Sequence, residues 1–462
     1  MRRLNIFIGA RLIGELLEGD DIWTLQYDSA WVDAPDGFAL APGLPRSKDP
    51  IVDGGTSRPV QWFFDNLLPE ERLREAISKE ADIRGEDAFG LLEYLGAESA
   101  GSLTLLPPDG PIPQPQALLP LSDAELSKRI SNLPKETLTH QASKRMSLAG
   151  AQHKMLVSYV DGELYEPAGA TASTHILKPS HPDPSTYPAS VMNEYLTMLM
   201  AKEARLDVPA VHIHYVPEPV YIIERFDRKV VKRAVGDSGA PELDVARLHI
   251  IDACQLLNRS RLYKHSGAGM QALKEIIAAT TSRIKTRVGI FRWLVFNILV
   301  ANDDNHLKNL SFFVSKNGIQ LAPHYDLIAT GYFYTASVAD EGATWPHVRM
   351  TIPLTGAKTF HDVNRDVVVN AGIELGLNAR TAERIVTEMV DKSDALLELA
   401  ERSMTQTHAT MPEKARVNAG GESRFVRALR HIIIPTMKKK LNQKATSTAS
   451  GGMAKHPARN KD

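Results

Sequence analysis

Three oxygen-bearing side chains in the second half of the chain have the types and spacing for phosphoryl transfer. Asp304 and Asn309 lie five residues apart in a polar segment after an apolar stretch, and Asp326 follows seventeen residues later. Hard cations such as Mg²⁺ prefer oxygen ligands, which Asn309 and Asp326 supply. Asp304 is then the carboxylate that positions a hydroxyl nucleophile and accepts its proton. The cluster therefore predicts ATP–Mg²⁺ chemistry.

Protein kinases place an Asp and an Asn at the same five-residue offset in their catalytic loop. The Arg of the kinase motif is replaced here by Asp303, which we interpret as a turn residue rather than a second base. Many kinases carry a Lys two residues after the catalytic Asp, whereas this chain has His306, and its nearest lysine is Lys308. The alternative interpretation is a helix end with turn-forming Asn and Asp side chains.

A lysine and a glutamate upstream would complete such a site. Lys178 ends the apolar strand segment 174–178, and Glu194 lies on the helix predicted after it. Kinases pair a strand Lys with a helix Glu to hold the α- and β-phosphates. The alternative is an ordinary surface ion pair.

Two further segments offer nucleotide contacts. Small residues in 147–154 let backbone N–H groups approach phosphates, although the segment is neither a Walker A motif nor a kinase glycine loop, and an ordinary turn is the alternative. Residues 224–228 stand where a kinase hinge would meet adenine, or they form a charged strand end. His212 and His214 alternate on a strand without a third ligand at metal spacing, so we interpret them as structural.

Hydrophobic spacing and turn residues predict a β-rich half before a mostly helical half. Strand signals dominate residues 1–60, helical signals dominate 61–96, and six prolines fall within 106–120. An apolar helix over 289–301 leads into the Asp304 segment. The elements predicted between these parts are strands at 155–160, 163–165, 174–178, 211–215 and 220–224 and a helix at 190–205. We expect an α+β protein with a ligand cleft between these two halves.

The predicted domain organisation follows these composition changes. Its parts are a β-rich N-terminal subdomain (1–105), a Pro-rich connection (106–140), a nucleotide-binding N-lobe section (141–228), a helical catalytic C-lobe (229–402), and a C-terminal helix with a basic flexible tail (403–462).

The composition of the 462 residues is that of a globular protein with two or three domains. The single cysteine, Cys254, excludes an internal disulfide and is predicted to be a buried, inert core residue. The longest apolar run, 295–301, is too short to cross a bilayer, so we expect a cytoplasmic protein without membrane contact.

The net charge of −1 is unevenly distributed, because the segment from Met437 onward carries seven Lys or Arg and one Asp. We interpret this segment as a solvated flexible tail, with contact to nucleic acid or an acidic partner as the alternative.

Taken together, the ordered motifs resemble the HipA family, the serine/threonine kinase toxins of bacterial type II toxin–antitoxin pairs. The similarity extends from about residue 4 to about residue 400. The motifs that carry it are Phe63–Glu70, Ala100–Leu103, Ser147–Lys154, Thr174–Lys178, Asn193–Tyr195, Glu224–Arg228, Phe296–Asn309 and Leu321–Leu327.

The resemblance implies a kinase-like fold and a role for each matching residue. Asp304 would be the catalytic Asp, Asn309 and Asp326 would bind Mg²⁺, and Lys178 would pair with Glu194. The loop from Ser147 would cover the phosphates, and Ser147 would be an autophosphorylation site that inactivates the kinase. The implied nucleotide-binding residues are Ser147, Gly150, Gln152, Lys154, Lys178, Glu224, Phe226, His306 and Tyr325.

The resemblance also implies partners. These are a helix-turn-helix antitoxin of the HipB type, operator DNA bound through the antitoxin complex, and a protein substrate such as an aminoacyl-tRNA synthetase, whose phosphorylation stops translation. Two other functions stay open: a DNA-binding co-repressor with weak or absent kinase activity, and a small-molecule kinase.

The chain departs from the family pattern at three positions. Ile250 stands where some members have a Gln that meets the ribose, and Ala301 and Arg205 each replace a common Gly. The segment after about residue 403 has no counterpart that we can assign.

Overall fold

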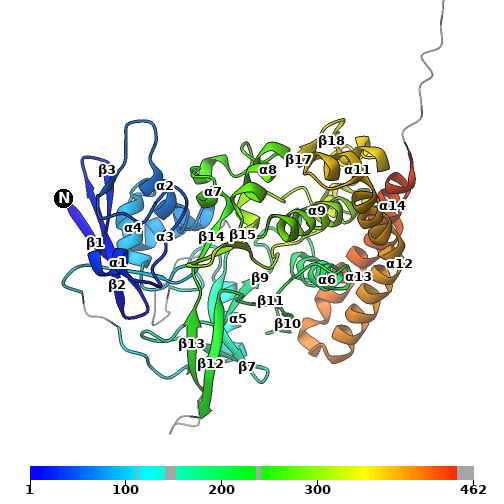
Figure 1. Ribbon diagram of the computed structural model, residues 1–462. Coiled ribbons are helices and arrows are strands. Elements are labelled where there is room, and N and C mark those ends of the chain that lie inside the picture. Colours follow the sequence, from blue (N-terminus) through cyan, green and yellow to red (C-terminus); the bar gives the residue numbers. More distant parts are fainter. Residues whose placement is uncertain (111–112, 141–151, 236–240, 445–462) are drawn as a thin grey trace, which may run out of the picture.

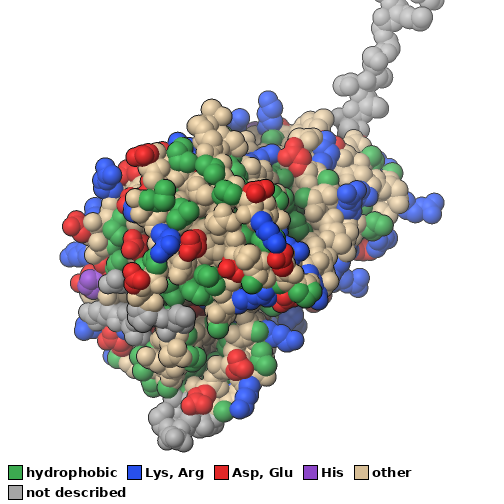
Figure 2. Space-filling view, turned by 60° about the vertical axis from the view of Figure 1, so that its left-hand side comes forward, with side chains coloured by type: hydrophobic (Ala, Val, Ile, Leu, Met, Phe, Trp, Pro, Cys, Tyr) green, Lys and Arg blue, Asp and Glu red, His purple; other side chains and the backbone are tan. Residues whose placement is uncertain are grey.

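The computed structural model describes residues 1–110, 113–140, 152–235 and 241–444. Figure 1 shows an N-terminal domain of strands and helices at the left, a second β-rich part in the lower centre and helices at the right. Among the described residues, no helix is long and apolar enough to cross a membrane. On the face that Figure 2 shows, basic and acidic side chains are interspersed, without a large area of one sign.

The N-terminal domain, residues 2–106, is an antiparallel sheet in the order β4-β3-β2-β1-β5 with packed helices. Every second residue of β3 is buried, at Trp23, Leu25 and Tyr27, because alternate strand residues face opposite sides of a sheet. The strands are β1 (Arg2–Ile8), β2 (Arg11–Gly19), β3 (Ile22–Tyr27), β4 (Ile51–Val52) and β5 (Leu103–Leu106). The helices are α1 (Ser29–Asp33), α2 (Pro59–Asp65), α3 (Glu71–Ala81) and α4 (Ala88–Leu95).

The second sheet has six strands in the order β10-β11-β9-β7-β8-β6 and lies between two helices. Val220 and Ile222 pack with Leu126 of α5 on one face, whereas Tyr221 and Ile223 join the core that contains α6. The strands are β6 (Leu119–Pro120), β7 (Met155–Val160), β8 (Glu163–Glu166), β9 (His175–Pro179), β10 (Val211–Tyr215) and β11 (Pro219–Glu224), and the helices are α5 (Asp123–Ser131) and α6 (Ser190–Glu203). The strands and the helix predicted for this section are confirmed.

The helical half is built around α9, which packs against α8, α12 and α14 and whose last seven residues, 293–299, are all buried. Its α-helices are α7 (Ala253–Leu256), α8 (Met270–Ala279), α9 (Arg283–Leu299), α10 (Ala336–Ala339), α11 (Arg365–Glu374), α12 (Ala379–Thr410), α13 (Ala419–Ala428) and α14 (Ile434–Asn442). Its strands are β12 (Arg228–Val235), β13 (Pro241–Arg247), β14 (Ile250–Asp252), β15 (Ser311–Ser315), β16 (Gly318–Leu321), β17 (Arg349–Leu354) and β18 (Ala357–Thr359). The short helices are η1 (Arg261–Tyr263), η2 (Leu307–Asn309), η3 (Thr330–Tyr334), η4 (Asp340–Gly342), η5 (Phe360–Asp362), η6 (Glu413–Asn418) and the π-helix η7 (Leu429–Ile433).

Two parts of the predicted domain organisation need correction. The connection 106–140 holds β6 and α5, and the Ser122 hydroxyl caps α5 by accepting from the N–H of Glu125. The predicted boundary after residue 402 lies inside α12, so it separates no structural units.

The basic C-terminal segment does not begin as a flexible tail. Met437 and Leu441 are buried in the core through α14, and Lys438 pairs with Asp394 at 2.7 Å. The remainder of the predicted tail, 445–462, lies outside the described residues. Cys254 is fully buried, as expected.

Both positions where this chain replaces a common glycine have left-handed backbone. Ala301 has a φ of 56° and Arg205 a φ of 64°. Arg205 follows α6, where its N–H donates to Lys202 O at 3.0 Å and the N–H of Leu206 donates to Ala201 O at 2.9 Å. This pair of bonds forms a helix-terminating motif whose left-handed position favours glycine. Both residues therefore adopt a backbone conformation that suits glycine better than alanine or arginine.

We predict that Arg205→Gly stabilises the protein by up to about 1 kcal/mol, because relief of the left-handed strain exceeds the entropy that glycine adds to the unfolded chain. Thermal or urea unfolding measures the change. Ala395→Gly, in the exposed middle of α12, is the matched control and should cost about 1 kcal/mol. Equal destabilisation by both substitutions would contradict the assignment of strain.

Candidate active site

The buried ammonium of Lys178 joins three segments of the chain. Its Nζ lies 2.7 Å from Oε1 of Glu194 on α6 and 2.6 Å from Oδ1 of Asp326, which follows β16. Lys178 is 8% exposed and Glu194 is 2% exposed, so the alternative of a surface ion pair is wrong. Asp326 has a φ of 59°, a strained conformation for a residue other than glycine.

The charges of this group depend on one another. Burial alone would lower the pKa of Lys178, but the carboxylates of Asp326 and Glu194 raise it. Burial opposes ionisation of Asp326 as well, yet Lys178 lowers the pKa of Asp326 to about 2. Burial raises the pKa of Glu194 to about 7. Lys178 is therefore held charged, and Asp326 is held ionised beside it.

The loop after α9 is braced by its own amide side chains. Asn302 Nδ2 donates to Asn297 Oδ1 at 2.7 Å, and the N–H of Asp304 donates to Asn302 Oδ1 at 3.0 Å. Asn309 Nδ2 donates to the carbonyl oxygen of Asp304 at 2.8 Å. The backbone N–H of Asp303 donates to the hydroxyl oxygen of Thr330 at 2.7 Å. This bond agrees with a structural role for Asp303.

The side chain of Asp304 is 53% exposed, and His306 Nε2 lies 3.9 Å from Asp304 Oδ1. Desolvation by the surrounding protein raises the pKa of Asp304, and the nearby carboxylates of Asp326 and Asp303 raise it further. Water moderates this rise, because half of the side chain stays exposed. Asp304 and Asp326 are thus electrostatic neighbours, although they are far apart in sequence.

The donor chemistry of this site fits a hard divalent cation. Asp326 and Asn309 offer oxygen ligands, and a cation between Asp304 and Asp326 would relieve the repulsion that raises the pKa of Asp304. A second group in the described part of the chain, His265, Asp304 and His306, brings possible ligand atoms within 4.8 Å of one another. Its two imidazoles suit zinc-type ions better than Mg²⁺.

Two predicted nucleotide contacts form an aromatic surface. The rings of Phe226 and Tyr325 are 5.5 Å apart, and Phe313 stands edge-on to Phe226 at 6.0 Å. The Tyr325 hydroxyl donates to Lys308 O at 2.6 Å. Glu224 ends β11, and its N–H donates to Ala210 O at 2.9 Å, so this N–H is already bonded.

The predicted phosphate-covering loop is only partly described. Ser147 and Gly150 lie outside the described residues. Gln152 Nε2 reaches Pro179 O, directly after Lys178, at 3.5 Å. Burial and the charge of Lys178 lower the pKa of Lys154 to about 8, which places Lys154 within electrostatic reach of Lys178.

The charged residues after β11 are buried, so they are not an ordinary solvated strand end. Arg225 and Arg228 both pair with Glu98 of the N-terminal domain, at 3.3 and 3.1 Å, and with Asp227 at 2.8 Å. Asp227 Oδ2 also accepts from the N–H of Gly101 at 2.7 Å. The sequence patterns do not indicate Glu98, because its partners lie about 130 residues away in the sequence.

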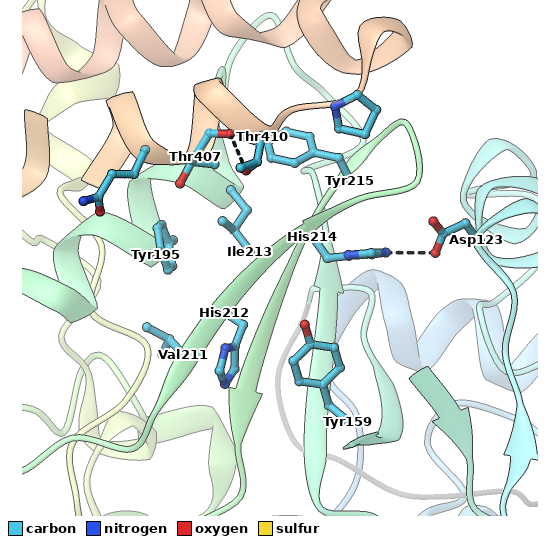
Figure 3. Close-up of a pocket in the computed structure, with 12 residues that line it drawn as sticks. Asp123, Tyr159, Tyr195, Val211, His212, Ile213, His214, Tyr215, Thr407 and Thr410 are labelled. Atoms are coloured by element: carbon cyan, nitrogen blue, oxygen red, sulfur yellow. Dashed lines mark hydrogen bonds and ion pairs between the residues drawn. The ribbon is translucent and has the colours of Figure 1, made fainter. Parts of the chain in front are cut away.

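A cavity of about 470 Å³ lies away from the Lys178 and Asp304 groups (Figure 3). Edge strand β10, α6 and the C-terminal end of α12 form its walls, and His212 and His214 line it. His214 Nε2 pairs with Asp123 Oδ1 at 2.8 Å, and the only metal-capable group found among the described residues does not include either histidine. The cavity shares no lining residue with the Lys178 and Asp304 groups.

Comparison with known proteins gives matches over most of the chain. The HipA N-terminal domain matches residues 4–106, and the HipA-like C-terminal domain matches residues 146–397. A protein of Sinorhizobium fredii provisionally named kinase Y4mE is 30% identical over 437 residues, which cover 92% of this chain and 97% of that protein.

Two further matches come from Shewanella oneidensis. Its serine/threonine-protein kinase toxin HipA is 29% identical over 349 residues, covering 71% of this chain and 76% of that protein. A solved complex of HipA, HipB and operator DNA contains a chain that matches with a TM-score of 0.74 and 23% identity, covering 95% of this chain and 97% of that chain.

The matches agree with the arrangement of β-rich and helical parts. Because the relatives are kinases, ATP is the implied phosphate donor. The chain therefore belongs to the HipA family and is a protein kinase of α+β, kinase-like fold.

Proposed function

We propose that this protein is an ATP–Mg²⁺-dependent serine/threonine kinase that acts as the toxin of a toxin–antitoxin pair. The observation that supports it best is the buried Lys178 ammonium, held between Glu194 and Asp326. A charged lysine beside an ionised aspartate is the arrangement that kinases use to bind nucleotide phosphates and metal.

Each residue of the site then has a distinct role. Lys178 would contact the α- and β-phosphates, and Asp326 and Asn309 would hold Mg²⁺, which supplies charge neutralisation at the phosphates when bound. Asp304 would accept the proton of the acceptor Ser or Thr hydroxyl while the hydroxyl oxygen forms the bond to the γ-phosphorus. The bond from the γ-phosphorus to the oxygen that bridges to the β-phosphate breaks, and ADP leaves. Phe226 and Tyr325 would pack near the adenine.

The names of two relatives support the proposed toxin role. The Shewanella oneidensis relative is named a kinase toxin, and the solved HipA structure contains HipB and operator DNA. We therefore propose a HipB-like helix-turn-helix antitoxin and operator DNA as partners of this chain. The proposed substrate is a translation protein such as an aminoacyl-tRNA synthetase, and autophosphorylation at Ser147 would switch the kinase off.

We predict that Asp304→Ala lowers phosphate incorporation from labelled ATP at least about 100-fold, because a general base contributes a factor of this order or more. Mass spectrometry of the purified protein should find phosphate on Ser147 in the wild type and little in the variant. Glu93→Gln, which changes an exposed carboxylate on α4, is the control and should behave as wild type. Wild-type incorporation by Asp304→Ala would exclude Asp304 as the base.

We predict that Lys178→Met weakens Mg-ATP binding by about 10- to 100-fold, the effect of losing charge-assisted hydrogen bonds. The substitution also leaves the carboxylates of Glu194 and Asp326 without their ammonium partner. The double variant Lys178→Met/Glu194→Gln therefore tests binding in a protein with less unpaired charge. Calorimetric titration on both variants measures the affinity. Wild-type affinity in the double variant would show that Lys178 only stabilises the fold.

A further inference from the structure

The catalytic loop is bonded to the N-terminal domain through one lysine, Lys308. Its Nζ donates to Asn66 O at 2.8 Å and to Asn66 Oδ1 at 2.9 Å, and it lies 2.8 Å from Asp252 Oδ2. Glu70 Oε1 is 3.3 Å away. An ammonium has three N–H donors, and these three close oxygens account for all of them.

This set of contacts is buried, so each bond matters energetically. Lys308 is 6% exposed, Asn66 2% and Glu70 2%. Burial alone would lower the pKa of Lys308, but Asp252 and Glu70 raise it. Lys264, before the loop in sequence, adds a second cation at 2.7 Å from Glu70 Oε2. A buried ammonium that lost these partners would be strongly unfavourable.

Lys308 also stands where a shift would disturb the catalytic groups. Lys308 belongs to η2 and lies between Leu307 and Asn309. The side-chain amide of Asn309 donates a hydrogen bond to the carbonyl oxygen of Asp304. The carbonyl oxygen of Lys308 accepts from Tyr325, the residue before Asp326. The side chain of Lys308 therefore faces the N-terminal domain, while its backbone contacts the segments that carry Asp304 and Asp326.

The same domain holds the segment after β11 through Glu98 and Gly101, which bind Arg225, Asp227 and Arg228. Figure 1 shows this domain beside α7, β14 and β15, next to the catalytic half. It thus contacts both the hinge segment and the catalytic loop.

We propose that Lys308 is a positioning residue of the kinase, and that the segment 66–70 of the N-terminal domain, through Lys308, holds the Asp304–Asn309 loop in its catalytic geometry. The proposal rests on the proposed function. The N-terminal domain is then a part of the catalytic machinery, and a partner that pulls segment 66–70 away from Lys308 lowers phosphoryl transfer without touching the nucleotide.

The test compares kcat, the KM for ATP and the melting temperature of full-length variants. Lys308→Met should lower kcat by about 30- to 100-fold, since a displacement of about 1 Å can cost a factor of this order. The KM for ATP should change less than threefold, because the side chain of Lys308 contacts Asn66, Glu70 and Asp252 and none of the proposed nucleotide-binding side chains. Asn66→Ala should lower kcat by itself, and it should add little to Lys308→Met, because the two residues act as a pair.

A second variant separates positioning from stability. Lys308→Met/Asp252→Asn removes one cation and one carboxylate together. In the wild type, Asp252 Oδ1 accepts a hydrogen bond from the N–H of Gln255 at 2.8 Å. The amide oxygen of the Asp252→Asn side chain can still accept this bond. We expect the melting temperature to recover while kcat stays low. Recovery of kcat together with the melting temperature would overturn the proposal.

Arg247→Gln is the matched control at the same interface. Arg247 donates to Thr104 Oγ1 at 2.8 Å and Leu103 O at 2.7 Å in the N-terminal domain, away from the catalytic loop. It should lower the melting temperature and leave kcat near the wild-type value. An equal loss of kcat in Arg247→Gln would also overturn the proposal. A wild-type protein without kinase activity would instead refute the proposed function, which this design detects separately.

Discussion

Pairing of buried ammonium groups is the constraint on which the active site depends. Lys178 and Lys308 are each less than a tenth exposed, and each is neutralised by two carboxylates from other segments. A lone buried charge costs several kcal/mol, so the chain must bring those carboxylates into place before either lysine can be buried. The β9 strand, helix α6, the loop after β16 and the catalytic loop are thereby fixed relative to one another.

This constraint also explains why the N-terminal domain packs so closely on the kinase half. Glu98 forms ion pairs with Arg225 and Arg228, and Glu70 forms ion pairs with Lys308 and Lys264. Removal of the domain would take one carboxylate from Arg225, Arg228 and Lys308, which would keep only Asp227 or Asp252, and would leave Lys264 without Glu70. The domain is therefore bound by charge complementarity at two separated points. These contacts fix the position of segment 225–228 relative to the loop that carries Asp304.

Local patterns in the sequence predicted the elements that carry the site, but not their long-range partners. The hairpin signal of Met155–Val160 before an Asp-Gly turn and the apolar helix before Asp304 were sufficient, because turn residues and apolar runs are local properties of the sequence. The Lys178–Glu194 pairing was predictable because kinases use it at a similar spacing. Glu98 and Asn66 were not identified, since nothing near them in sequence indicates a partner more than 120 residues away.

Two helices had local signals in the sequence that were given too little weight against proline content and charge. Six prolines suggested a plain connection over 106–140, yet Ser122 and the acids after it are the usual start of a helix. A run of lysines suggested a tail from Met437, although Met437 and Leu441 have the spacing of one buried helix face. The left-handed backbone at Ala301 and Arg205 could not be read from those residue types, because only glycine signals it.

The most direct test of the account is a crystal structure of the protein with Mg²⁺ and a non-hydrolysable ATP analogue. We predict the metal on Asp326 and Asn309, Lys178 within hydrogen-bond distance of the phosphates, and Asp304 facing the γ-phosphate. Nucleotide bound elsewhere, for example in the cavity beside β10, with the Lys178–Asp326 group unchanged and free of metal, would contradict it.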